Sequence, residues 1–233
     1  MNYQESQKFE KSKKVAVIVA HPDDETLWAG GTILSHNDWE CYIISMCRAN
    51  DENRAPKFYE TLKILNSKGT MGNLDDGPEQ KHLTEDEVEK KILDLLPIEH
   101  FDIIITHNPM GEYTRHLRHE EVGQAVINLW NRKKIKTDAL WVFAYEDGNK
   151  AYFPQPILRA NLFIRLTENT WQKKFNIITQ TYGFGLNTFE ALTTPKAEAF
   201  SKFTDAKKAK EWLENCGCIS HNTKQEYEST SAI

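Results

Sequence analysis

The sequence has little of several features that mark specialised classes of protein. It contains only four cysteines among 233 residues, too few for a disulfide scaffold in a chain of this length. No apolar run approaches the ~18 residues that a membrane-spanning helix needs. The apolar run nearest the start, Val15 to Ala20, is also shorter than the ~7–15 residues of a signal-peptide core. We therefore expect a cytoplasmic protein with no membrane partner.

The sequence also lacks an excess of positive charge. Its 29 Lys and Arg residues face 34 Asp and Glu residues, a formal net charge of −5. Duplex nucleic acid is usually bound by a basic face, so we expect no nucleic-acid partner. The basic run 132–136 follows a predicted helix, where it would complement the helix dipole in solvent. No repeat and no Pro/Gly-rich linker divides the chain. We predict one catalytic domain, 1–233, with less ordered tails at 1–13 and about 219–233.

Strands and helices alternate along the first two thirds of the chain. The β-branched run 15–20 is typical of a strand buried on both faces. Further strands are predicted at 41–46, 101–106, 139–145 and 161–166. Helices are predicted at 25–35, 58–67, 85–96, from the end of loop 107–118 to 130, and at 167–180, 196–203 and 206–215. This alternation indicates a parallel α/β sheet.

Local signals refine three of these elements. Thr84, with Glu87 three residues later, is the capping-box pattern that opens a helix. Gly30-Gly31 inside the first helix predicts a close approach to the strand beneath it. Cys41 and Cys47 lie in or beside an apolar segment, which indicates buried free thiols.

Two polar clusters follow predicted buried strands. One is His21-Pro22-Asp23-Asp24-Glu25, and the other runs from His107 to His119. Ligands of open parallel sheets bind beyond the carboxyl ends of the strands, so the clusters line one crevice if the strands are neighbours. Histidines with carboxylates suit Zn²⁺, and two histidines with one carboxylate also suit Fe²⁺. Either cluster alone has a structural explanation, as acids at a helix N-terminus or as histidines on a solvated helix face.

The two clusters resemble the motifs of the PIG-L/LmbE-like N-deacetylase family. Ala20 to Glu25, followed by Gly30-Gly31-Thr32, is similar to the first motif of that family. Thr106 to His119 is similar to the second motif. Weaker similarities are Arg54, the segment 74–77, and Trp171 with Lys173-Lys174 and Tyr182. The resemblance covers roughly residues 14–205.

This resemblance implies a Rossmann-like three-layer α/β fold with a mostly parallel central sheet. It also implies zinc-dependent hydrolysis of an N-acetyl group on a small molecule, commonly an N-acetylglucosamine-type amino sugar or its conjugate. By motif position, the expected metal ligands are His21, Asp24 and His119. The expected catalytic residues are Asp23 as general base and His116 as oxyanion stabiliser, with the imidazolium form of His116 as one option. Arg54 and Asp75 match positions that bind sugar hydroxyls.

The second motif departs from the family pattern at two places. Tyr113 is a further candidate hydrogen-bond donor. Thr114-Arg115 follows it where the family usually has one glycine, and this extra residue puts the role of Tyr113 in question. Arg118 replaces an acidic residue between the two histidines. A residue at this position can pair with the first histidine or contact substrate. We assign Arg118 to substrate binding and hypothesise that it favours an anionic group there.

Other interpretations stay open from the sequence. A metal-bound water can also attack phosphorus, so a phosphoesterase is one alternative. A non-catalytic sugar- or metal-binding protein is another. Cys216 and Cys218 with His221 allow a metal or redox cluster, although plain thiols are favoured. A homo-oligomer is also left open.

Overall fold

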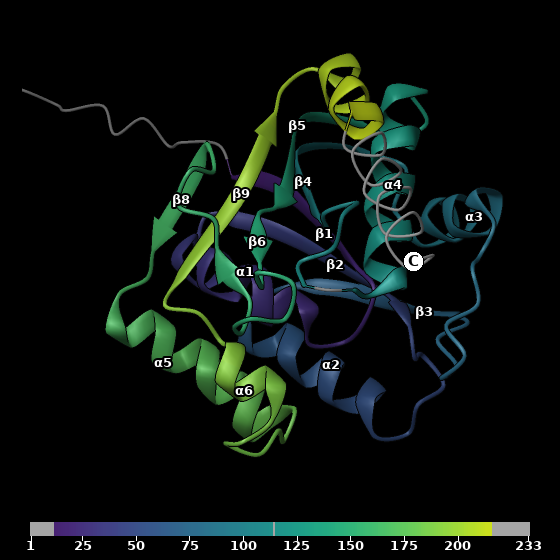
Figure 1. Ribbon diagram of the computed structural model, residues 1–233. Coiled ribbons are helices and arrows are strands. Elements are labelled where there is room, and N and C mark those ends of the chain that lie inside the picture. Colours follow the sequence, from purple (N-terminus) through teal and green to yellow (C-terminus); the bar gives the residue numbers. More distant parts are fainter. Residues whose placement is uncertain (1–11, 114, 216–233) are drawn as a thin grey trace, which may run out of the picture.

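A seven-stranded sheet forms the centre of the computed structural model, which describes residues 12–113 and 115–215 (Figure 1). The strand order is β3-β2-β1-β4-β5-β9-β8. The strands are β1 (Lys13–Val19), β2 (Trp39–Cys47), β3 (Lys68–Leu74), β4 (His100–Thr106), β5 (Lys136–Phe143), β8 (Leu162–Arg165) and β9 (Ala197–Phe203). The first five pair in parallel, and β9 runs antiparallel to both β5 and β8. A separate two-stranded sheet joins β6 (Tyr145–Glu146) and β7 (Gln155–Pro156).

Helices cover both faces of this sheet. They are α1 (Asp24–Ser35), α2 (Arg54–Ile64), α3 (Glu85–Leu95), α4 (Leu117–Asn131), α5 (Glu168–Asn176), the π-helix η1 (Ile177–Thr181) and α6 (Phe189–Thr193). Residues 206–215 are also helical. Side chains of α1, α2 and η1 belong to the hydrophobic cluster on one face, and those of α3 and α4 to the cluster on the other. The prediction of a mostly parallel, three-layer α/β fold is confirmed.

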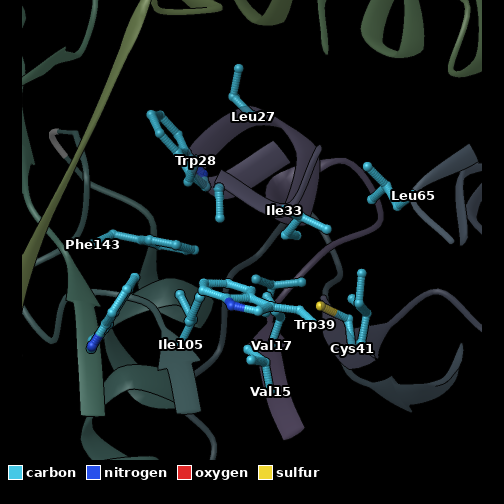
Figure 2. Close-up of a cluster of buried hydrophobic side chains, with 14 of the residues drawn as sticks. Val15, Val17, Leu27, Trp28, Ile33, Trp39, Cys41, Leu65, Ile105 and Phe143 are labelled. Atoms are coloured by element: carbon cyan, nitrogen blue, oxygen red, sulfur yellow. The ribbon is translucent and has the colours of Figure 1, made fainter. Parts of the chain in front are cut away.

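The position of strand β1 in the centre of the sheet explains its continuous run of apolar residues. Val15 and Val17 belong to the cluster on the α1 side, and Ala16 and Ile18 belong to the cluster on the α3–α4 side. Figure 2 shows the first of these clusters, where the valines of β1 lie under Trp39. A central parallel strand is buried on both faces, so neither face carries polar residues.

Local predictions were confirmed at several places. Thr84 and Glu87 form the expected capping box at the start of α3. Cys41 and Cys47 are buried free cysteines. Cys216, Cys218 and His221 lie outside the described residues, as do both predicted tails apart from residues 12 and 13. Within the described part of the chain, no helix has the length and apolar character needed to span a membrane.

The helix predicted at 196–203 was wrong, because this segment is strand β9. It pairs with β5 on one side and β8 on the other. Glu198 is fully buried there and bonds to α1, a tertiary contact that outweighs the helix propensity of the segment.

Strand β3 was not predicted. Its sequence contains Gly69 and Gly72 and few β-branched residues, and it lies at the edge of the sheet. The helix before it also begins and ends earlier than predicted, at Arg54 and Ile64.

The close approach predicted for Gly30-Gly31 involves a different partner from the strand beneath the helix. A Cβ atom at Gly31 would lie 2.3 Å from a methyl group of Leu166, which follows β8. The side-chain atoms near Gly30 belong to Thr26 and Lys174. These glycines therefore let α1 pack against the segment that leads from β8 into α5.

The strand order places a crevice beside β1. The chain builds β2 and β3 on one side of β1 and then crosses to β4 on the other side. Such a reversal leaves room for a ligand at the carboxyl ends of the two strands.

Candidate active site

The carboxyl ends of β1 and β4 bring the two polar clusters together. These strands pair in parallel, with Ile18 opposite Thr106. His21 and Asp24 follow β1 directly, while His119 lies in the first turn of α4. The prediction that both clusters line one crevice is therefore confirmed. The crevice contains a pocket of about 200 Å³.

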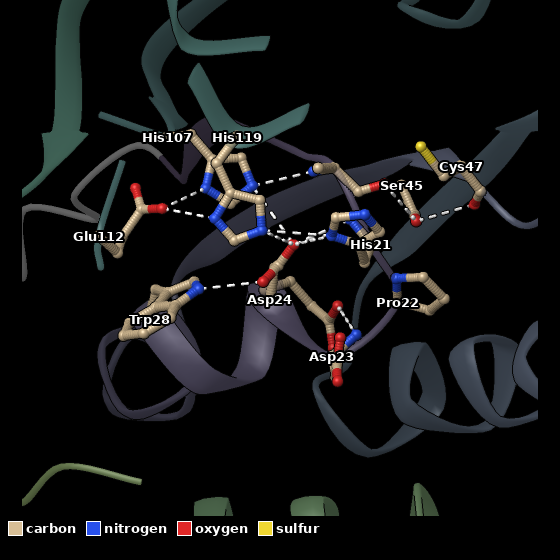
Figure 3. A network of polar contacts seen from close by, with 12 residues as sticks. His21, Pro22, Asp23, Asp24, Trp28, Ser45, Cys47, His107, Glu112 and His119 are labelled. Atoms are coloured by element: carbon tan, nitrogen blue, oxygen red, sulfur yellow. Dashed lines mark hydrogen bonds and ion pairs between the residues drawn. The ribbon is translucent and has the colours of Figure 1, made fainter. Parts of the chain in front are cut away.

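Three donor atoms form a small triangle at this pocket (Figure 3). His21 Nδ1 lies 3.1 Å from Asp24 Oδ2 and 3.2 Å from His119 Nε2, and the third side, from His119 Nε2 to Asp24 Oδ2, is 3.2 Å. Ligands about 2.0 Å from a tetrahedral Zn²⁺ ion lie about 3.3 Å apart. The triangle therefore has the size of one face of such a site, which leaves the fourth position for water or substrate.

Asp24 and His119 are also held by hydrogen bonds to their other polar atoms, and His21 has a carboxylate near its second nitrogen. Trp28 Nε1 donates to Asp24 Oδ1 at 3.0 Å. His119 Nδ1 is 2.6 Å from Glu112 Oε2, and His21 Nε2 is 3.1 Å from Asp76 Oδ1. Metal-binding histidines usually give their second nitrogen to a carboxylate in this way, which fixes the tautomer and the ring orientation.

His107 supports the triangle without belonging to it. Its Nε2 accepts a hydrogen bond from the backbone N–H of Ala20 at 2.9 Å, so its Nδ1 carries the proton and donates to Glu112 Oε2 at 3.0 Å. Both ring nitrogens are therefore engaged within the protein. The ring of His107 stacks on the ring of His119, with 3.9 Å between the two centroids.

Sequence reasoning assigned no role to Glu112, His107 or Asp76. Glu112 lies inside the second motif, between its first and last histidines, and that position was an available signal. A carboxylate spaced between two histidines is a candidate for bridging them. No comparable signal distinguished Asp76 from its neighbour Asp75.

Asp23 has the most unusual backbone in the site. Its φ is 121°, a region that L-residues rarely adopt, and it is the residue that precedes the first turn of α1. Its side chain does not cap the helix. Instead, its Oδ2 lies 3.2 Å from Arg54 Nη1, and both residues line the pocket. The strained turn thus directs a carboxylate into the pocket beside Asp24.

Burial and the adjacent Asp24 carboxylate raise the pKa of Asp23 well above its ordinary value, although Arg54 opposes this effect. A raised pKa makes a carboxylate a better proton acceptor. Glu25 holds this turn through hydrogen bonds. Its Oε2 accepts a hydrogen bond from the backbone N–H of Asp23 at 3.0 Å, and its Oε1 accepts one from the Tyr182 hydroxyl at 2.8 Å.

His116 and Tyr113 also line the pocket. The ring of His116 is 4.5 Å from that of His21, and its buried Nδ1 has no hydrogen-bond partner among the described residues. Burial and the neighbouring imidazoles of His119 and His21 lower the pKa of His116 to about 3. These surroundings favour the neutral ring of His116 over its imidazolium form. The ring of Tyr113 lies 6.0 Å from that of His116.

The structure does not bring Asp75 or Arg118 to this pocket. Asp75 is exposed, and its Oδ1 accepts the backbone N–H of Gly77. Arg118 is fully buried, and its guanidinium bonds to Glu121 and to the backbone carbonyls of Asp75 and Lys81. These bonds connect the loop after β3 to α4, and the buried guanidinium is not accessible to substrate. The neighbouring Asp76 lines the pocket, whereas Asp75 does not.

Residues 16–130 match the family model described as PIG-L: GlcNAc-PI de-N-acetylase. The matched range includes both histidine motifs.

Solved structures share the fold. N,N'-diacetylchitobiose deacetylase from Pyrococcus horikoshii is similar with a TM-score of 0.61 and 18% identity, covering 87% of this chain and 88% of that one. GalB, the 4-carboxy-2-hydroxymuconate hydratase from Pseudomonas putida KT2440, gives a TM-score of 0.56 and 15% identity over 83% and 97% of the two chains. The zinc-inhibited form of teicoplanin deacetylase Orf2 gives 0.56 and 14% over 77% and 88%.

A hydratase among these structures shows that the fold alone does not determine the reaction. The family model and the two motifs are more specific than the fold. On that basis, this chain belongs to the PIG-L/LmbE-like deacetylase family.

Proposed function

We propose that this protein is a metal-dependent hydrolase that removes the acetyl group from a nitrogen atom of a small molecule. The substrate we propose is an N-acetylglucosamine-type amino sugar or a conjugate of one. The observation that carries this proposal is the triangle of His21, Asp24 and His119 atoms, with Asp23 and His116 lining the same pocket. The matched family model and the chitobiose deacetylase support the choice of an acetylated amino sugar.

His21, Asp24 and His119 would hold the metal ion. Two imidazoles and one carboxylate suit Zn²⁺, and the same set suits Fe²⁺ as the alternative. When bound, the ion would polarise the acetyl carbonyl and lower the pKa of a bound water toward ~7.

Asp23 is the proposed general base. Its carboxylate takes a proton from the attacking water and later returns one to the leaving amine. Arg54 holds this carboxylate in the pocket. Because Asp23 is next to Asp24 in the sequence and turned away by its backbone, it reaches the water without taking a position on the metal.

His116 is the proposed oxyanion stabiliser, acting as a neutral ring that donates a hydrogen bond. Such a donor typically contributes ~3–4 kcal/mol to stabilising the transition state. Tyr113 is a second proposed donor in the same pocket. Arg48, Arg54 and Asp76 line the remaining side, where they would bind sugar hydroxyls in place of the predicted Asp75 and Arg118.

Acetate release tests the proposal. Protein loaded with Zn²⁺, or with Fe²⁺ without oxygen, is incubated with N-acetylglucosamine, N,N'-diacetylchitobiose and alkyl N-acetylglucosaminides, and acetate is measured enzymatically. We expect release from at least one of these. Asp23→Asn should retain the metal but lose roughly 10²–10⁴-fold in kcat.

Asp138→Asn is the matched control, since Asp138 is an exposed carboxylate that pairs with His100 outside the site. It should leave the rate unchanged. Metal binding without acetate from any substrate would contradict the proposed reaction. Full activity in Asp23→Asn would contradict the proposed base.

A further inference from the structure

The π-helix η1 ends in a buried tyrosine, Tyr182. An α-helix bonds each N–H to the carbonyl four residues earlier, but the N–H of Tyr182 bonds to the carbonyl of Ile177, five residues earlier, at 2.9 Å. Such π turns are rare, and they occur frequently at functional sites. Ile177 and Ile178 contribute apolar side chains to the cluster on the α1 side, whereas Tyr182 brings a hydroxyl into it. A buried tyrosine hydroxyl usually has a hydrogen-bond partner.

The partner of this hydroxyl is Glu25, in the first turn of α1. The Tyr182 hydroxyl donates to Glu25 Oε1 at 2.8 Å, and Thr26 Oγ1 donates to the same oxygen at 2.6 Å. The other oxygen, Oε2, accepts the backbone N–H of Asp23 at 3.0 Å. Glu25 is 0% exposed and Tyr182 is 2% exposed, so water does not compete for these bonds. The bonds therefore fix the orientation of the Glu25 carboxylate.

The bond from Asp23 to Glu25 acts on the strained part of the backbone. Asp23 precedes α1 and has a φ of 121°. Rotation about its N–Cα bond turns the preceding peptide plane relative to the helix, so relaxation to an ordinary φ would break this hydrogen bond. The Glu25 carboxylate, held in turn by Tyr182, therefore opposes relaxation of the strain.

A second route from the same segment reaches the carboxylate of Asp23. Lys57 Nζ, on α2, donates to the backbone carbonyl of Tyr182 at 2.7 Å. One turn earlier on α2, Arg54 Nη1 lies 3.2 Å from Asp23 Oδ2. The Arg54 guanidinium also lies 4.5 Å from the ring centroid of Phe184. The turn that follows η1 thus contacts the partners of both the backbone and the side chain of Asp23.

We infer, on the basis of the function proposed above, that Glu25 and Tyr182 are positioning residues for the general base Asp23. Neither of them lines the catalytic pocket. They hold the strained backbone so that the Asp23 carboxylate faces the attacking water. The π turn determines which residue of this segment faces α1, and it presents the hydroxyl that Glu25 needs.

Urea titrations of metal-loaded variants test the effect on the backbone without any assay of activity. Only glycine adopts a positive φ without strain, so Asp23→Gly should be more stable than Asp23→Ala. In protein that carries Glu25→Met and Tyr182→Phe, this difference should fall to zero or change sign. These two changes replace both partners by apolar groups of similar shape, so we expect the protein to fold. Tyr145→Phe should leave the difference unchanged, since Tyr145 is a buried tyrosine that donates instead to the carbonyl of Trp28 in α1.

Kinetics with an acetate-releasing substrate test the effect on catalysis. Tyr182→Phe removes one oxygen atom, and we expect kcat to fall about tenfold because the base is misplaced. KM should stay within twofold, and bound metal should be unchanged. Added to Asp23→Asn, the same substitution should have no further effect on kcat. Glu25→Gln keeps an oxygen for the Asp23 N–H and should retain more activity than Glu25→Met. Tyr145→Phe should leave kcat unchanged.

A stability difference at position 23 that persists with Glu25→Met and Tyr182→Phe would overturn the inference. An equal loss of kcat with and without Asp23→Asn would also overturn it, because Tyr182 would then act on the fold as a whole. If no substrate releases acetate, the proposed function fails, and the urea titrations still decide whether Glu25 and Tyr182 hold Asp23. If the double variant does not fold, Tyr182→Phe alone replaces it in the titrations. It should already reduce the difference, and an unreduced difference would overturn the inference.

Discussion

At the scale of single residues, Asp23 combines backbone strain with a position in the pocket. A non-glycine residue at φ 121° is destabilised by roughly 1–3 kcal/mol, and such strain is common at active sites. The contacts that hold it come from Glu25 and Arg54. The turn therefore lowers the stability of the fold while it orients a carboxylate into the pocket.

Paired substitutions separate this strain from the loss of the side chain. Asp23→Gly and Asp23→Ala both remove the carboxylate, but only glycine adopts a positive φ without strain. We expect Asp23→Gly to have a free energy of unfolding about 1 kcal/mol higher than Asp23→Ala in urea titrations. The same pair at Asp138, inside strand β5, should show the reverse order. Equal stability of the two variants at position 23 would contradict the presence of strain.

Single residues also show the limits of sequence reasoning. His21, Asp24 and His119 could be proposed as metal ligands because they occupy positions in recognisable motifs. Asp75 and Asp76 could not be separated, because the sequence does not fix which of two adjacent carboxylates a loop turns inward. Arg118 looked like a substrate contact, yet its partners are the carbonyls of a loop about forty residues earlier, which only the folded chain brings near.

At the scale of elements, a buried ion pair joins α1 to α5 and β9. Glu198 Oε1 accepts from Gly31 N–H at 2.8 Å and from Lys174 Nζ at 2.7 Å, and its Oε2 accepts from Thr32 N–H at 2.7 Å. Both charged side chains are fully buried. The pair therefore fixes the helix whose first turn carries Asp24.

Breaking this pair should be strongly destabilising. Glu198→Gln leaves the Lys174 ammonium buried without a countercharge, and we expect a loss of about 3–5 kcal/mol in the free energy of unfolding. Glu168→Gln breaks the exposed pair with Lys196 and should lose less than about 1 kcal/mol. Addition of Lys174→Met to Glu198→Gln should restore part of the stability. Similar losses in the two single variants would contradict this role.

Contacts between distant segments explain which elements were predicted poorly. Parallel strands β1, β2, β4 and β5 were recognised because two-faced burial leaves a continuous apolar run. Strand β9 contains a buried glutamate, and its sequence is typical of a helix. Edge strand β3 contains two glycines. Their conformation comes from neighbours in the sheet and from α1, which local sequence does not encode.

At the scale of the whole molecule, strand order positions the site. Residues nearly a hundred positions apart meet because strands are added to the sheet first on one side of β1 and then on the other. The sequence predicted this crevice from the two clusters and the strands before them. It did not predict a larger groove next to this crevice, because the two segments that mainly line the groove, 147–158 and 189–197, lie far apart in the sequence. A cytoplasmic location stays a prediction.

A bound metal would tie β1, α1 and α4 together at this crossing, so its removal should affect the whole fold. Binding to the native state alone adds about 4 kcal/mol of stability when the free metal exceeds its Kd about 1,000-fold. In a protein of this size that corresponds to a Tm shift on the order of 10 °C. We expect a chelator to lower Tm by this amount in calorimetry and Zn²⁺ or Fe²⁺ to restore it. His119→Ala should unfold at a Tm that the chelator does not change, whereas His100→Ala, an exposed histidine outside the site, should respond like the unaltered protein. A Tm that responds to neither chelator nor metal would contradict a metal site at His21, Asp24 and His119.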